Sequence, residues 1–195
     1  MTEPVPSSVV QQIPLTDRTM KNSFLSVLCL LFVMPGQAFC QSQPTPNFLT
    51  AEWQRAKEFT LEYLGAMPDD GYNFKPTPEM RTFAQQFIHL ANDNYGFTAT
   101  ITGKPNPYPN AGETEKDPSL QSKAAVTKFV IDSYDFVING LAGLTVAQLQ
   151  EKTGKRNLPR EQYFFKAFEH QTHHRGQATV YLRLKGVKPP NEKLF

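Results

Sequence analysis

The chain has 195 residues and a net charge of +2, and 19% of its residues are charged. Neither the net charge nor any run of like charges indicates binding to nucleic acid or to an anionic membrane surface. A chain of this length can form one domain with a sizeable hydrophobic core.

Residues 1–40 predict an N-terminal extension followed by a secretory signal peptide. Lys21 precedes an apolar run over residues 24–34, and a Pro-Gly pair follows the run. Small residues at Ala38 and Cys40 predict cleavage after Cys40. A basic start, about a dozen apolar residues and a small-residue break are typical of such peptides, and the run is too short to span a bilayer. We therefore expect a periplasmic or secreted protein whose mature form has no stable membrane span.

The start of translation and the fate of Cys40 both have alternatives. Residues 1–19 are polar and resemble an upstream extension, so we expect translation to start at Met20. Lipidation of Cys40 would make the protein a lipoprotein, but Phe39 is bulky where such a site needs a small residue, which favours simple secretion. A buried helix over residues 24–34 is a further alternative, which the basic flank and the Pro-Gly pair disfavour.

Both cysteines, Cys29 and Cys40, lie in the segment that cleavage would remove. The mature chain would therefore contain no cysteine, which excludes a disulfide scaffold, a thiolate nucleophile and a cysteine-based zinc site. We expect a linker over residues 41–47 and one helical domain over residues 48–195.

Two helices are predicted in the first half of this domain. Apolar residues at spacings of three and four between Leu49 and Met67 indicate the first helix, and a Pro-Asp-Asp-Gly sequence ends it. The second helix is predicted over residues 79–100, with Thr77 as its N-cap and a proline at its first position.

His89 belongs to the second helix and lies outside the centre of its apolar arc. At about 100° per residue, it shares a stripe with Gln85, Asn92 and Asp93. Either His89 faces solvent, or this helix borders a polar cleft as well as the apolar core.

The second half of the chain contains a long loop and further helices. Residues 103–118 are rich in Pro, Asn and Gly without an apolar period, and loops of this length tend to be functional or mobile. A third helix is predicted over residues 119–139, a short helix capped by Thr145, and a fourth helix from after Pro159 to Lys185. No segment alternates as a strand, so the pattern predicts an all-α four-helix bundle.

Three of the four histidines lie in the fourth helix. His170 and His174 are one helical turn apart and project from one face, in line with Tyr163 and Tyr181, which are expected in the core. Two imidazoles at this spacing can bind one metal ion. His173 competes for the second position, but His174 aligns more closely with His170.

The candidate metal ligands are His89, His170 and His174. Neutral imidazoles suit zinc or nickel, with iron, manganese or copper as further candidates. Three protein ligands leave an open position for water or substrate, which is typical of catalytic sites. Histidines that bind nothing are the alternative that helical spacing alone leaves open.

Other polar residues near these histidines have expected roles. A ligating histidine usually donates its second N–H to an outer acceptor, and Asp93, Gln177 and Glu169 are candidates for that position. Arg175 is expected to face solvent as a salt-bridge partner, with an anion clamp as the alternative.

Residues 170–177, with the sequence His-Gln-Thr-His-His-Arg-Gly-Gln, are followed by residues 181–190, which end in a Pro-Pro pair. Together these segments closely resemble the C-terminal motif of the DinB family of metalloenzymes. Residues 74–91 and 102–106 resemble its second-helix segment and the loop after it. The resemblance extends over about residues 48–190 of the chain.

The resemblance implies both a fold and a ligand set. The fold is an up-down-down-up four-helix bundle, and the ligands of a divalent metal map onto His89, His170 and His174. Characterised relatives include thiol-dependent S-transferases and a mycothiol-dependent isomerase, and many members have no known reaction. Low-molecular-weight thiols are mostly cytosolic, so the predicted secretion disfavours a thiol transferase here.

We therefore predict a metal-dependent enzyme of the hydrolase or transferase type that acts on an unidentified small molecule. A non-catalytic metal-binding or stress-associated helical protein is the alternative, and a purely structural bundle is the third. No nucleic-acid partner is expected. A homodimer is compatible with the resemblance, although nothing in the sequence predicts its interface.

Overall fold

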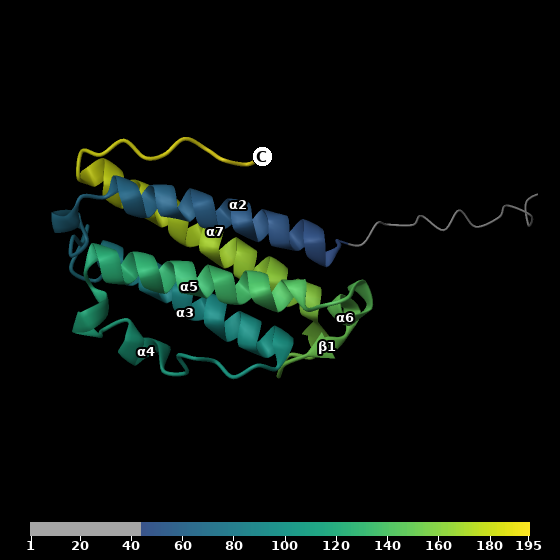
Figure 1. The fold of residues 1–195 in the computed structure, drawn as a ribbon. Helices are drawn as coiled ribbons and strands as arrows, with labels where there is room; N and C mark the ends of the chain where they lie inside the picture. The colour runs from purple at the N-terminus through teal and green to yellow at the C-terminus, as the bar shows by residue number, and fades with distance from the viewer. Residues whose placement is uncertain (1–43) are drawn as a thin grey trace, which may run out of the picture. The chain divides into compact units, whose positions relative to one another are not determined.

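Four long helices form most of the structure (Figure 1): α2 (Pro46–Ala66), α3 (Phe83–Thr102), α5 (Lys123–Ala142) and α7 (Arg160–Leu184). The structure is a computed structural model that describes residues 44–195. The predicted extension, the signal peptide and the start of the linker lie outside the described residues. No helix in the described part of the chain combines the length with the apolar composition that spanning a bilayer requires.

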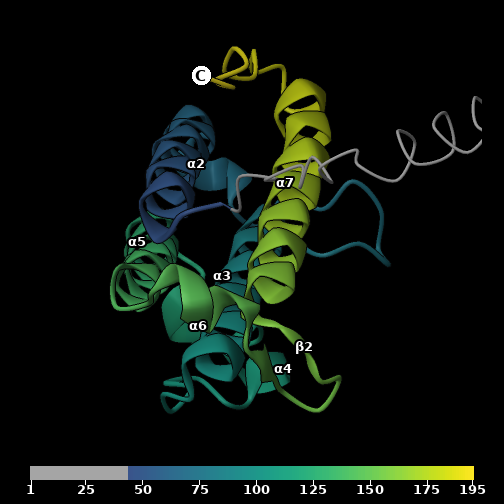
Figure 2. The ribbon, with the colours of Figure 1, turned by 90° about the vertical axis from the view of Figure 1, so that its right-hand side faces the viewer.

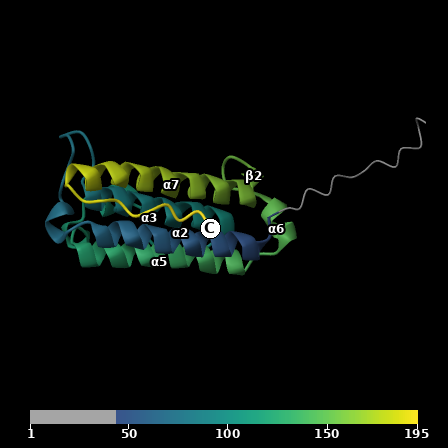
Figure 3. The same cartoon turned by 90° about the horizontal axis from the view of Figure 1, so that it is seen from above.

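The four long helices lie lengthwise beside one another. The colour gradient in Figure 1 shows that α2 and α7 run in one direction and that α3 and α5 run in the other. Figure 3 shows the same lengthwise arrangement from above. Helix α3 packs against both α5 and α7, and α2 packs against α5. The chain is mostly helical, as the periodicity predicts.

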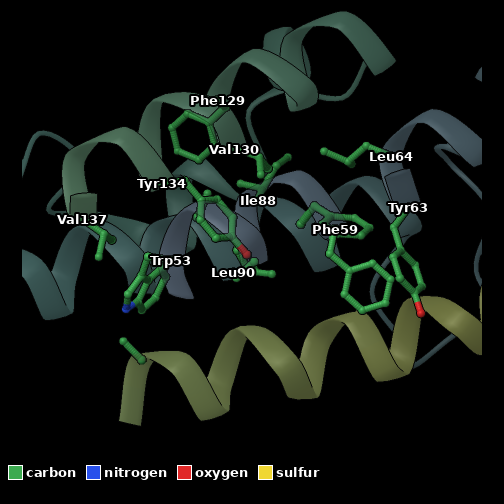
Figure 4. Packing of buried hydrophobic residues seen from close by; sticks show 14 of the residues in the cluster. Trp53, Phe59, Tyr63, Leu64, Ile88, Leu90, Phe129, Val130, Tyr134 and Val137 are labelled. Atoms are coloured by element: carbon green, nitrogen blue, oxygen red, sulfur yellow. The ribbon is translucent and has the colours of Figure 1, made fainter. Parts of the chain in front are cut away.

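The core lies between these helices and is rich in aromatic side chains. Figure 4 shows Trp53 of α2 and Tyr134 of α5 turned toward the interior, and their ring centroids are 5.7 Å apart. Phe168 of α7 packs edge-on against Trp53 at 5.5 Å. Burying one large apolar side chain contributes about 1.5–3 kcal/mol. These contacts therefore join α2, α5 and α7.

The second long helix begins later than predicted. Its N-cap is Thr82, whose Oγ1 accepts the backbone N–H of Gln85 at 3.0 Å, while Gln85 Oε1 accepts the backbone N–H of Thr82 at 3.0 Å. This reciprocal capping box fixes the start of α3 at Phe83. The prediction of Thr77 as the N-cap was wrong, because the chain after it forms a turn in which the Met80 N–H donates to the Thr77 carbonyl.

The link before α3 is held on the first turn of that helix. The backbone N–H groups of Phe83 and Ala84 donate to the carbonyl oxygens of Phe74 and Tyr72, at 3.0 and 2.9 Å. The first N–H groups of a helix have no partner within it, so these two bonds satisfy donors that would otherwise need water. The link is thereby fixed beside the helix that carries His89.

Short elements occupy the connections between the long helices. The link after α2 contains the 3-10 turn η1 (Asp69–Gly71). The loop after α3 contains α4 (Ala111–Thr114) and η2 (Pro118–Leu120). Helix α6 (Val146–Gln150) follows Thr145, which caps it as predicted.

The third long helix also begins later than predicted. The chain turns through η2, and the Ser122 side chain then caps α5 by accepting the backbone N–H of Ala125 at 3.3 Å. The helix therefore starts at Lys123 instead of residue 119.

A short hairpin precedes α7. Strands β1 (Lys152–Thr153) and β2 (Leu158–Pro159) pair antiparallel, and Figures 1 and 2 show them at the same end of the structure as α6. Two residues are too few to show an alternating pattern, so the sequence did not predict these strands. Gly154 in the turn has φ +66°, and a Cβ there would lie 2.6 Å from Tyr163 Oη. Only glycine fits this position without displacing Tyr163.

Candidate metal centre

The structure brings His89 of α3 together with His170 and His174 of α7. One ring nitrogen from each histidine lies within 4.8 Å of the other two, and the Nε2 atoms of His170 and His174 are 3.1 Å apart. The centroids of the three rings are 4.4–5.2 Å apart. Because α3 and α7 pack lengthwise, a histidine of α3 meets a pair spaced one turn apart on α7. This group could hold a metal ion.

His174 is the buried member of the group, with 4% of its surface exposed. Burial, together with the neighbouring imidazoles, lowers the pKa of His174 to about 3. The ring is therefore neutral near pH 7 and keeps a lone pair for a metal ion.

Gln86 fixes the orientation of His174. Its Oε1 lies 2.7 Å from His174 Nδ1, and its Nε2 donates to Gln177 Oε1 at 2.9 Å and to Tyr181 Oη at 3.0 Å. The Tyr181 hydroxyl in turn donates to the Arg81 carbonyl at 2.7 Å. Because Gln86 Oε1 can only accept, His174 carries its proton on Nδ1 and turns its Nε2 lone pair toward His170.

Glu115 occupies the corresponding position behind His89. Its Oε1 lies 2.5 Å from His89 Nδ1, and its Oε2 accepts a hydrogen bond from Arg81 Nε at 2.9 Å. A carboxylate on the outer nitrogen of a histidine orients the ring and raises its basicity. The long loop after α3 thus supplies a side chain that contacts a candidate ligand.

Asp93 lies at the third histidine. Its Oδ2 is 3.0 Å from His170 Nε2. Burial opposes ionisation of this carboxyl group, but the hydrogen bond from His170 and the three imidazoles outweigh it, so the pKa of Asp93 is lowered. An ionised carboxylate at this edge adds negative charge, which favours a cation among the rings.

The donor set fits a divalent ion. Three nitrogen donors converge from two rigid helices, two of them are oriented by outer partners, and a carboxylate lies beside the third. The buried Nδ1 of His170 has no hydrogen-bond partner among the described residues. The ring is thus held through its Nε2 side alone, which is the side that meets His174.

A family model described as the DinB family matches residues 41–194. The chain belongs to the DinB family. The match extends over all four long helices and over the three histidines of the centre.

Two solved structures of DinB-like proteins share the fold. One, from Bacillus cereus ATCC 10987, has a TM-score of 0.65 at 22% identity, and the match covers 77% of this chain and 99% of that chain. The other, YjoA from Bacillus subtilis, has a TM-score of 0.59 at 20% identity, and the match covers 75% of this chain and 96% of that chain. No curated protein matches the sequence.

The expected outer acceptors do not hold the second N–H of a candidate ligand. Asp93 contacts His170 at Nε2, the nitrogen that faces His174, and Gln177 contacts Gln86 and His173. Glu169 is exposed and pairs with Lys166 at 3.1 Å, so it has no part in the centre.

Sequence reasoning missed Gln86 and Glu115. Gln86 precedes His89 by three residues on α3, and this spacing on a helix could have indicated it. Glu115 lies in a loop without periodicity, so no pattern placed it beside a histidine.

His173 is not part of the group formed by His89, His170 and His174. Its ring is exposed, and its Nε2 accepts a hydrogen bond from Gln177 Nε2 at 2.6 Å. Of the two candidates on α7, the structure therefore groups His174, and not His173, with His89 and His170.

The prediction that Arg175 faces solvent was wrong. The side chain is buried, and its guanidinium lies 5.0 Å from the centroid of the Phe59 ring. It donates to Thr60 Oγ1 at 3.2 Å and to Gln171 Oε1. No carboxylate of the described residues pairs with it, so Arg175 joins α7 to α2 through neutral acceptors. Burial lowers the pKa of Arg175.

A polar pocket of about 590 Å³ lies beside Gln86 and Glu115, and none of the three histidines is among the residues that line it. We call it the polar pocket; its wall includes Lys75, Arg81, Gln86, Glu115, Lys116 and Gln177. Two of these side chains are the outer partners of His174 and His89, so the pocket reaches the residues that directly contact the candidate ligands. Helix α3 thus borders a polar pocket as well as the apolar core, and the partly buried His89 contacts that pocket's wall through Glu115.

Proposed function

We propose that this DinB protein is a metal-dependent enzyme of the hydrolase or transferase type, built on a four-helix bundle. His89, His170 and His174 are its metal ligands in this proposal. The observation that carries it is the convergence of three imidazoles, two of which are held by Gln86 and Glu115, residues that line the polar pocket. Small-molecule sites are typically concave and carry a few convergent polar groups, so a pocket of this kind favours an enzyme over a protein that only stores or senses a metal.

The residues of the chain prepare the centre in two ways. Gln86 and Glu115 hold the outer nitrogens of His174 and His89, so both rings are oriented before any ion binds. Asp93 places an ionised carboxylate within reach of His170. When bound, a divalent ion would supply a Lewis acid with a position open to water or substrate.

Zinc or nickel is the ion that we propose. All three donors are imidazole nitrogens, and the described residues place no thiolate beside them. This donor set is typical of borderline metals such as zinc and nickel, whereas magnesium and calcium prefer oxygen donors.

The metal assignment is tested by elemental analysis of the purified protein and its variants. We expect about one zinc or nickel ion per chain, and its loss in His170→Ala and His89→Ala because each change removes one of only three ligands. His173→Ala is the matched control, since His173 lies on the same helix but outside the centre, and it should keep its metal. Unchanged metal content in His170→Ala would contradict the assignment.

The enzymatic part is tested with a panel of ester, amide and thiol-acceptor substrates. We expect turnover that a chelator abolishes, that added metal restores and that His170→Ala lacks. A protein that binds its metal fully but turns over no member of the panel would favour the non-catalytic metal-binding alternative.

We also propose export to the periplasm or the medium. The support is the basic, apolar and small-residue order over residues 20–40. N-terminal sequencing of the protein from its native host should begin at Gln41. A mature chain that begins at Met1 or Met20 would contradict this proposal.

A further inference from the structure

The polar pocket has the size and the position of a substrate site. Its volume of about 590 Å³ lies within the usual range for small-molecule sites. Its wall comes from the link before α3, from the loop after it and from α3 and α7 themselves. These segments meet around the outer partners of the histidines.

Positively charged side chains outnumber negatively charged ones in the wall of the polar pocket. Lys75, Arg81 and Lys116 face only two carboxylates, and one of these, Glu115, is already matched by Arg81 and His89. Neither Lys75 nor Lys116 forms an ion pair with any described residue. Two ammonium groups on opposite segments are therefore available to a ligand, and a divalent ion at the imidazoles would strengthen the positive field.

The rest of the wall is hydrophilic. Met80 is its one apolar side chain, whereas Gln85, Gln86 and Gln177 contribute amides. Gln85 uses its Oε1 in the capping box, and its Nε2 has no partner among the described residues, so it remains a donor. An apolar ligand could bury little apolar surface against this wall.

A carboxylate fits this wall better than a phosphate does. Phosphates typically bind to free backbone N–H groups at the start of a helix. At the start of α3, the N–H groups of Phe83, Ala84, Gln85 and Gln86 are all bonded within the protein. The donors that remain are side-chain groups, namely the ammonium groups, the amides and the outer N–H groups of Arg81, and one or two of these suffice for a carboxylate.

We propose that the substrate of this enzyme is a small, hydrophilic carboxylate, and that Lys75 and Lys116 hold its carboxylate group. The remainder of the molecule lies along Gln86 and Glu115, the two wall side chains that contact His174 and His89. This inference rests on the proposed function, because it treats the polar pocket as the substrate site of that centre.

The test is a calorimetric titration of the full-length, metal-loaded protein with succinate, succinamide and inorganic phosphate. Succinate should bind saturably, and succinamide, its uncharged counterpart, and phosphate should bind more weakly. The double variant Lys75→Gln/Lys116→Gln should bind succinate about tenfold more weakly, because two charge contacts are lost. Lys152→Gln/Lys155→Gln is the matched control, since it removes the same charge from the hairpin, and it should bind like wild type.

Four results would overturn the inference: no succinate binding to metal-loaded protein, succinamide binding as tightly as succinate, phosphate binding more tightly, or equal losses in the two double variants. Metal content and the unfolding temperature are measured on each sample. If the wild-type protein retains no metal, the proposed function itself is overturned. If the metal-loaded protein does not bind succinate, only the assignment of the substrate is overturned.

Discussion

Among single residues, Gln86 connects a candidate ligand, His174, to the polar side chains around it. If its side-chain amide flipped, Nε2 would face His174 Nδ1, and the hydrogen bonds from Nε2 to Gln177 and Tyr181 would be lost. The proton of His174 is thereby kept on Nδ1. Gln86 lies three residues before His89 on α3, yet it acts on His174. It determines that His174 presents Nε2, and not Nδ1, to a metal ion.

Gln86→Ala should lower metal affinity about 10–100-fold, the usual effect of removing an outer partner of a metal-bound histidine. The three ligands remain in this variant, but His174 is free to rotate and to exchange its tautomer. Competition with a chromophoric chelator measures the affinity directly.

Gln162→Ala is the matched control for this change, because Gln162 is an exposed glutamine on α7. It should bind metal like wild type. Equal affinities of Gln86→Ala and wild type would show that the Gln86 contact does not orient the ligand.

Single residues also show where prediction from sequence ends. His170 and His174 follow from helical spacing, because both lie on one helix and the spacing fixes their relative position. Glu115 could not be found in this way, since its place depends on the path of a loop. Arg175 was misplaced because the acceptors that make its burial tolerable, Thr60 and Gln171, lie on two different helices.

At the scale of the elements, the caps decide where each helix begins. Thr77 and the proline after it are typical of a helix start, but Thr82 and Gln85 form both bonds of a capping box. The capping box satisfies two backbone N–H groups, and this stabilises a helix start at Phe83 more than the Thr77-Pro78 pair stabilises an earlier start. Helix centres are predictable from apolar spacing, whereas their ends depend on which of several polar residues completes the bonds.

Thr82→Ala should therefore lower the free energy of unfolding by about 1 kcal/mol, the usual effect of losing a capping side chain. Thr77→Ala, the control at the rejected cap, should change it by clearly less. Urea unfolding followed by circular dichroism measures both variants. A larger loss in Thr77→Ala would place the functional cap at the earlier threonine.

At the scale of the whole molecule, buried tyrosines determine how the fold responds to alkali. Burial raises the pKa of Tyr134 to about 12, and burial likewise raises the pKa of Tyr72 to about 12. In the unfolded chain a tyrosine ionises near pH 10. The stabilisation from these neutral phenols is complete below that pH and is lost as the pH rises through 12.

Between about pH 10 and pH 12, each of these tyrosines should lower the free energy of unfolding by about 1 kcal/mol per pH unit. Burial also raises the pKa of Tyr95 and of Tyr181, so these phenols add to the decline. Tyr134→Phe removes one of the contributions and should make the decline shallower, although it also removes the hydrogen bonds to Thr60 and Gln171 and so lowers stability at neutral pH. Urea unfolding across this range measures the slope. An unchanged slope in Tyr134→Phe would contradict the role of this phenol.

The centre takes its histidines from α3 and α7 only, so α2 and α5 are under no chemical constraint from it. Mutations can accumulate in those two helices as long as the apolar core stays filled and Thr60 and Tyr134 keep their buried hydrogen bonds to Arg175 and Gln171. For protein engineers, α2 and α5 are therefore the helices to randomise when solubility or thermal tolerance must change while the metal chemistry is preserved.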